Sequence, residues 1–184
     1  MLSEYFQEVA DCLIGINQAE IQCALEMLNE SSLKGRKILI AGNGGSAAIA
    51  AHFAVDLIKS GHLRNDSIKA IALSDNAALI TATANDFSFE DIFSWQIHEL
   101  GESEDLLFVI SSSGNSMNIL NALDVAKKLG IKSISITGFD GGEASKKSDL
   151  ALVTKSDLGN YGPVEDSHSI LCHYISRKIL SFPN

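Results

Sequence analysis

Residues 37–57 read KILIAGNGGSAAIAAHFAVDL, and this stretch decides the fold. It opens with an apolar run, continues through a glycine-rich loop and ends in an alanine-rich segment with helical spacing. A short run that is continuously apolar, rather than alternating, is typical of a strand covered on both faces, as in a parallel sheet. The stretch therefore predicts a strand–loop–helix unit of an α/β domain.

The same pattern recurs along the rest of the chain. The predicted strands are residues 37–41, 69–73, 105–110, 133–137 and 150–153. The predicted helices between and after them are residues 46–59, 77–84, 89–100, 116–129 and 164–180. Alternating strands and helices favour right-handed crossovers. We therefore expect a three-layer α/β/α sandwich with a five-stranded parallel sheet, of the flavodoxin-like class.

Residues 1–33 form a helical lead-in to this core in our prediction. Apolar residues recur three or four positions apart from Phe6 to Ile16. A second helix is expected to begin after Gly15, where Asn17 and Glu20 have capping-box spacing. Because the chain has 184 residues, we expect a single domain over residues 1–184, with residues 34–184 as its ligand-binding core.

Composition excludes several classes of function. The formal net charge of -9 disfavours binding to nucleic acids and to anionic membranes. Neither a secretory leader nor a membrane-spanning run is apparent, so we expect a cytoplasmic protein. The three cysteines, Cys12, Cys23 and Cys172, form no C-x-x-C pair, which argues against a disulfide framework and a structural zinc site.

Two loops after predicted strands carry the residues suited to binding a ligand. The first is the loop Gly42-Asn43-Gly44-Gly45-Ser46 and the second is Ser111-Ser112-Ser113-Gly114-Asn115-Ser116, and each opens a helix. Ligands of open α/β sheets bind beyond the carboxyl ends of the strands. Serine hydroxyls, glycines and helix N-termini are neutral donors that suit a phosphate monoester. We expect a phosphate ester as the ligand.

The first loop also permits other interpretations. Gly42, Gly44 and Ala47 match the dinucleotide fingerprint G-x-G-x-x-A, with Asp75 as a distant candidate for the ribose acid, and the loop could also be a plain tight turn. The serine-rich loop favours the phosphate ester, because a dinucleotide site has no need of it. Neither loop ends in Gly-Lys-Ser/Thr, which excludes a Walker-type nucleotide site.

The segments GNGGSA, HFAVDL, TANDFSFEDIF, ISSSGNS and ITGFDGG occur in the order and spacing of SIS-domain phosphoheptose isomerases, which the chain resembles over nearly its whole length. The resemblance implies interconversion of sedoheptulose 7-phosphate and D-glycero-D-manno-heptose 7-phosphate through an enediol. It also implies a homotetramer with active sites built from more than one subunit, and no nucleotide cofactor. A non-catalytic SIS module, either a sugar-phosphate binder or a tetrameric adaptor, is the alternative.

The resemblance also implies roles for individual residues. The family segment His-Phe-Ala-Glu-Glu-Leu places the catalytic carboxylate at Asp56, and a family Gln and His eight residues apart correspond to Glu165 and His173. Asp56 and His173 are therefore expected to be catalytic, and His52, Asp56, Glu165 and His173 together could hold zinc. The expected substrate- and phosphate-binding residues are Asn43, Gly44, Gly45, Ser46, Asn85, Asp86, Ser111, Ser112, Ser113, Ser116 and Glu165.

The chain departs from the family pattern at three of these positions. Asp56 is one methylene shorter than the family's glutamate, which withdraws the carboxylate by about 1 Å. Glu165 adds a negative charge where the family has glutamine, and this charge suits a divalent cation. Gly162 stands where the family commonly has an aspartate. These departures bear on the identity of the sugar more than on the phosphate site.

Overall fold

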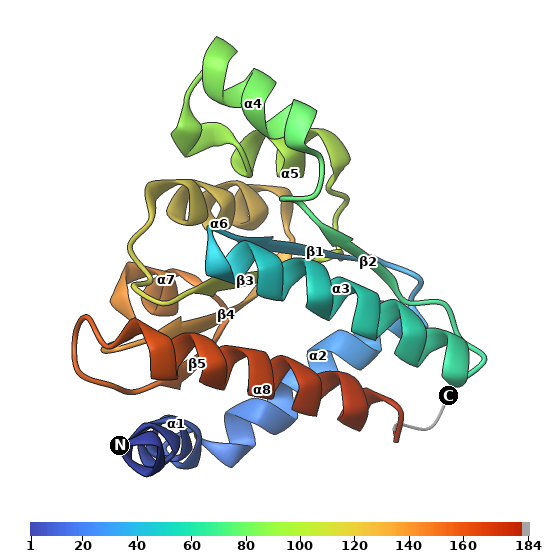
Figure 1. Ribbon diagram of the computed structural model, residues 1–184. Helices are drawn as coiled ribbons and strands as arrows, with labels where there is room; N and C mark the ends of the chain where they lie inside the picture. Colours follow the sequence, from blue (N-terminus) through green and yellow to red (C-terminus); the bar gives the residue numbers. More distant parts are fainter. Residues whose placement is uncertain (182–184) are drawn as a thin grey trace.

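The computed structural model of the chain describes residues 1–181 (Figure 1). Its strands are β1 (Lys37–Gly42), β2 (Lys69–Ala72), β3 (Leu106–Ser111), β4 (Lys132–Gly138) and β5 (Leu150–Thr154). Its helices are α1 (Leu2–Ile14), α2 (Gln18–Leu33), α3 (Gly45–Leu63), α4 (Ala77–Asp86), the 3-10 helix η1 (Phe89–Asp91), α5 (Ser94–Leu100), α6 (Met117–Leu129), α7 (Gly142–Lys147) and α8 (Tyr161–Ile179). None of these helices is long and apolar enough to cross a membrane.

The five strands form one parallel sheet in the order β2-β1-β3-β4-β5, which confirms the predicted flavodoxin-like α/β fold. Strand β1 pairs with β2 on one side and with the central strand β3 on the other, so that Ile38 lies between Ala70 and Leu106. Every residue of β3 is buried, as its continuous apolar run predicts.

Helices cover both faces of the sheet, as Figure 1 shows. Alternate residues of β1 point to opposite faces: Ile38 and Ile40 join a core with residues of α2, α3 and α8, whereas Leu39 and Ala41 join a core with residues of α5 and α6. The lead-in helices α1 and α2 are both present, and the Asn17 side chain caps α2 by accepting from the Ala19 N–H. A layer of helices on each face of the sheet makes the three-layer sandwich that the sequence predicts.

Two helical segments differ from the prediction. The helix expected at residues 89–100 is broken into η1 and α5, because the Ser88 hydroxyl caps a separate short turn: it accepts from the Glu90 N–H and donates to the Asp91 carboxylate. Helix α7 was not predicted, since it has only six residues and begins with two glycines of positive φ, the N-cap Gly141 and the first helical residue Gly142. A helix of this length is too short to show apolar periodicity.

The order of the strands fixes the place of the ligand crevice. The chain leaves β1 toward α3 on one face of the sheet and leaves the adjacent β3 toward α6 on the other face. The loops after β1 and β3 diverge at this topological switch point, which is where open α/β sheets bind their ligands. The glycine-rich loop and the serine-rich loop are those two loops.

Candidate functional site

A cavity of about 190 Å³ lies at the switch point, between the two predicted loops. The loop after β1 and the start of α3 contribute Asn43 and Ser46, and α8 contributes Tyr161 and Glu165. The remaining lining residues come from β3 and the loop after it: Ile110, Ser111, Ser112, Ser113 and Ser116. The structure thus brings together seven of the residues predicted to bind a phosphate ester, and we call this space the serine cavity.

The serine loop presents free hydroxyl groups beside a helix N-terminus. Ser116 is the N-cap residue of α6, yet its side chain makes no capping hydrogen bond. Ser112 Oγ is buried and has no hydrogen-bond partner within residues 1–181. The hydroxyl oxygens of Ser111 and Ser113 accept from the N–H groups of Gly114 and Asn115, each at 3.2 Å, which leaves their protons available to a ligand. Such a set of donors suits an anion.

Asn43 is held by a side chain that the sequence reasoning missed. Asn43 and Asn118 exchange two amide hydrogen bonds, of 2.8 and 2.9 Å, so the pair joins the loop after β1 to α6. Because both of its amide groups are engaged, Asn43 positions the loop. The signal in the sequence was a polar residue, Asn118, next to apolar residues of a predicted helix. In the structure only 2% of the Asn118 surface is exposed, and a buried amide of this kind needs hydrogen-bond partners.

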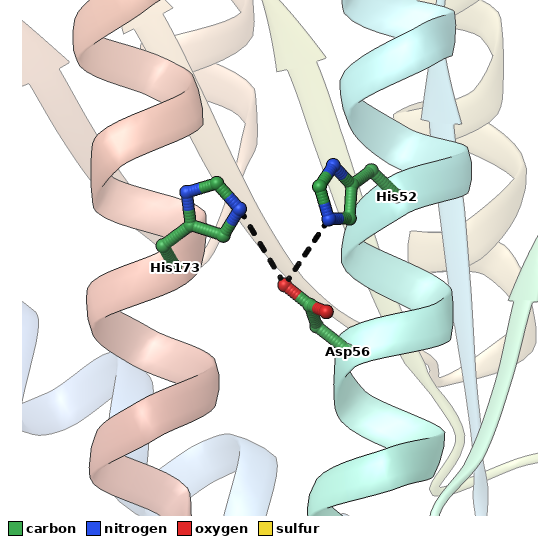
Figure 2. Close-up of side chains that lie close together, drawn as sticks. All are labelled: His52, Asp56 and His173. Atoms are coloured by element: carbon green, nitrogen blue, oxygen red, sulfur yellow. Dashed lines mark ion pairs between the residues drawn. The ribbon is translucent and has the colours of Figure 1, made fainter.

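A second cluster lies between α3 and α8, where His52, Asp56 and His173 converge (Figure 2). The Nε2 atoms of both imidazole rings lie 3.6 Å from the same oxygen, Asp56 Oδ2. The two rings meet edge to face with centroids 4.9 Å apart. His52 and Asp56 share a helix face because they are four residues apart.

The cluster lines its own cavity of about 180 Å³, with Ala48, Ile49, Phe53, Ser169 and Cys172 as the other lining residues. Burial raises the pKa of the Cys172 thiol, and the nearby Asp56 carboxylate raises it further. The thiol is therefore protonated at neutral pH and is a poor nucleophile. The side chains of this cavity that remain for acid–base chemistry are the two imidazoles and the carboxylate.

These three side chains fit a divalent cation. One atom from each of His52, Asp56 and His173 lies within 4.8 Å of the others, and both histidines are exposed. Two imidazole nitrogens and one carboxylate oxygen, with a position left open, are an ordinary donor set for catalytic zinc. The arrangement therefore supplies three of the four predicted ligands.

The fourth predicted ligand, Glu165, lies elsewhere. It is eight residues from His173 on α8, which corresponds to roughly 12 Å along a helix axis. Glu165 lines the serine cavity instead, and its Oε2 atom would lie 2.7 Å from a Cβ atom placed on Gly45. Within the described chain Glu165 is not part of the metal-capable group.

The other predicted residues do not line either cavity. Asn85 and Asp86 lie exposed at the end of α4, where the Asn85 amide donates to the Asp86 carboxylate at 2.8 Å. Gly44 is the N-cap of α3 and has a φ of 53°, a conformation that favours glycine. In this chain, the structure does not bring Asn85 and Asp86 to the serine cavity.

His168, a neighbour of the site on α8, is a buried structural residue. Its Nε2 atom lies 3.0 Å from Thr154 Oγ1, and the Thr154 hydroxyl donates to the Thr137 carbonyl. The imidazole therefore donates from Nε2 and is neutral. Burial lowers the pKa of His168 to about 4, and the Thr137 backbone offsets this only in part.

Comparison with known proteins gives a consistent picture. The family model described as SIS domain matches residues 4–138. A phosphoheptose isomerase of Helicobacter pylori (strain P12) is 40% identical over 158 residues, which are 86% of this chain and 81% of that protein. A phosphoheptose isomerase of Sulfurimonas denitrificans is 41% identical over 76% of this chain and 71% of that protein.

The folds of two solved structures match that of this protein over almost the whole chain. The structure of a phosphoheptose isomerase from Francisella tularensis has a TM-score of 0.87 and 31% identity, over 98% of this chain and 94% of that one. The structure of a phosphoheptose isomerase from Neisseria gonorrhoeae has a TM-score of 0.88 and 30% identity, over 98% of this chain and 95% of that one.

Proposed function

The chain belongs to the phosphoheptose isomerase family of SIS-domain proteins, and from this premise we propose that it interconverts a ketose phosphate and an aldose phosphate. The proposed substrate is sedoheptulose 7-phosphate and the proposed product D-glycero-D-manno-heptose 7-phosphate. One observation carries the proposal. Helices α3 and α8 line one cavity whose serine hydroxyls are neutral hydrogen-bond donors for an anion and, further along the same helices, a second cavity with a carboxylate and two imidazoles.

The distance between the two cavities suits a long sugar phosphate. Ser46 lines the serine cavity and His52 lines the other, and six helical residues span about 9 Å. A ligand whose phosphate binds at Ser111–Ser116 would extend its carbon chain along α3 and α8. The carbonyl at the opposite end of the sugar would then approach Asp56 and His173.

Proton transfer between adjacent carbons requires a base and a partner acid. We assign the base to Asp56, which is half-buried on α3, and the partner to His173, which faces it from α8. The Asp56 carboxylate would take the proton from the carbon beside the carbonyl, while His173 gives a proton to the carbonyl oxygen and forms the enediol. Asp56 then returns its proton to the former carbonyl carbon, while the hydroxyl of the neighbouring carbon gives its proton back to His173, and the aldose is formed. His52 orients Asp56 through the same oxygen.

Zinc is part of this proposal as a cofactor. His52, Asp56 and His173 would hold it, and a bound zinc ion would then supply Lewis-acid polarisation of the carbonyl oxygen in place of the proton from His173. No nucleotide cofactor is proposed, because the serine-rich loop suits a phosphate monoester and a dinucleotide site has no need of it.

Two broader properties complete the proposal. We propose a homotetramer, which the exposed apolar side chains of α1, α3 and α8 support, among them Leu2, Phe6, Val55 and Ile170. A cytoplasmic location is supported by the three free cysteines, since a reducing compartment keeps thiols free. A non-catalytic sugar-phosphate module or adaptor is less favoured, because it has no need of the His52, Asp56 and His173 cluster.

The proposal is tested by an assay of the purified protein with sedoheptulose 7-phosphate, with and without a chelator. We expect an aldose phosphate to accumulate until equilibrium and expect the chelator to slow the reaction if zinc takes part. Binding of the sugar phosphate without any aldose formation, with metal supplied, would favour the non-catalytic module.

A further inference from the structure

Glu165 brings a negative charge into a cavity that is otherwise neutral. Its side chain is half-buried, and it is the one charged group among the residues that line the serine cavity in the described chain. No lysine or arginine of residues 1–181 lines the cavity to balance it. An anionic ligand in this cavity therefore meets hydroxyl donors on one side and a carboxylate on the other.

The carboxylate lies against the N-terminus of α3. Gly45 is the first residue of α3, and a Cβ atom there would lie only 2.7 Å from Glu165 Oε2. Gly45 does not have a positive φ, so space for the carboxylate explains the glycine better than backbone conformation does. The N-cap Gly44 provides no side-chain cap and the first turn of α3 has no acidic residue. Glu165 thus lies close to the N-terminus of α3, a region in which the helix dipole also favours an anionic ligand.

The same loop carries the fingerprint Gly42, Gly44 and Ala47, which in dinucleotide-binding proteins brings a pyrophosphate to a helix N-terminus. Here the chain's own Glu165 carboxylate lies beside the first residue of that helix, Gly45. The second helix N-terminus at the cavity, that of α6, has the uncapped Ser116 and remains available to a ligand.

We propose that Glu165 is a specificity-determining residue that limits the site to a single phosphoryl group. The inference rests on the proposed function, because it takes Ser111–Ser116 as the site of the sugar's phosphate. The single phosphoryl group of a monoester binds at the α6 N-terminus and does not reach Glu165, while the uncharged carbon chain extends along α3 and α8. A diphosphate would place its second phosphoryl group beside Glu165, where like charges repel each other.

The experiment compares Glu165→Gln with wild type, using inorganic phosphate and pyrophosphate as probes. The substitution keeps the shape of the side chain and removes its charge. Asp166→Asn is the matched control, because it removes the same charge one residue along, from an exposed side chain that accepts from the Tyr5 hydroxyl at 2.7 Å and does not line the cavity. Affinities are measured by calorimetry at low ionic strength, without divalent cations.

We expect Glu165→Gln to tighten pyrophosphate binding on the order of a hundredfold and phosphate binding about tenfold, because a charge near the ligand acts most strongly on the more highly charged probe. The ratio of the two affinities should change about tenfold in Glu165→Gln and less than about twofold in Asp166→Asn. Glu165→Ala should shift the ratio in the same direction, which provides a second variant if the amide disturbs the fold.

An unchanged affinity ratio in both Glu165 variants, or an equal change in Asp166→Asn, would overturn the inference and leave the proposed function standing. If neither phosphate nor pyrophosphate bound to wild type or to either Glu165 variant, the serine cavity would not be an anion site. That outcome would overturn the inference and the proposed phosphate site together.

Discussion

His168 should make the stability of the protein fall in mild acid. The imidazole is fully buried, it donates from Nε2 to Thr154, and its Nδ1 atom has no hydrogen-bond partner in the described chain. A second proton would place an uncompensated charge in the core. Burial accordingly lowers the pKa of His168 from 6.5 to about 4.

The direction and size of the effect follow from this difference in pKa. Between pH 6.5 and pH 4 the unfolded chain binds a proton at His168 that the folded chain does not. The free energy of unfolding therefore has its full value above pH 6.5 and decreases as the pH falls. At about 1.4 kcal/mol per pH unit, the loss from this one residue reaches roughly 3 kcal/mol near pH 4.

The assay is urea unfolding of wild type and His168→Gln at a fixed protein concentration, from pH 7.5 to pH 4.5. The Gln amide can still donate to Thr154 and does not titrate, so the variant should be less stable at pH 7.5 and should lose less stability on acidification. His62→Gln, at an exposed position, is the control and should follow wild type. Parallel stability curves for wild type and His168→Gln would refute the reasoning.

Three further predictions concern the site. Asp56→Asn should lower turnover by about 10³-fold, as expected for loss of a general base, while calorimetry shows sugar-phosphate binding retained; a wild-type rate would remove Asp56 from the reaction. Ser113→Ala combined with Ser116→Ala should weaken sugar-phosphate binding by about 10- to 100-fold without changing the melting temperature much, and unchanged affinity would exclude the serine cavity. Asn118→Ala should cost about 1–3 kcal/mol in urea unfolding, because it leaves the Asn43 amide unpaired, and no loss would show that the pair is not needed.

The sheet was predictable because its strands are continuously apolar. Each of the five strands lies within a residue or two of its predicted range, since burial on both faces leaves little freedom in composition. The break at residues 92–93 was not predicted, because it depends on capping by Ser88, which competes locally with a continuous helix.

The positions of candidate site residues were predictable where the residues are consecutive in a loop or lie one helical turn apart. Ser111–Ser116 and the pair His52 and Asp56 lie as expected, because loop sequence and the four-residue period fix them locally. The position of Glu165 beside Gly45, and the pairing of Asn43 with Asn118, depend on how α8 and α6 pack against the loop after β1. From the sequence we expected Glu165 and His173 in one zinc site, whereas their eight-residue spacing separates them by roughly 12 Å along α8 and Glu165 lines the serine cavity.

The central claim is that Asp56 and His173 move a proton through an enediol, and a solvent-exchange measurement tests it most directly. Sedoheptulose 7-phosphate is incubated with the protein in deuterium oxide and followed by proton NMR, with Asp56→Asn as the parallel sample. The account predicts that in the wild-type sample deuterium enters at the terminal carbon next to the carbonyl of the ketose and at the carbon next to the aldehyde of the product, and that Asp56→Asn shows almost none. Unlabelled sugar in both samples, with zinc supplied and with the sugar shown to bind, would contradict the account.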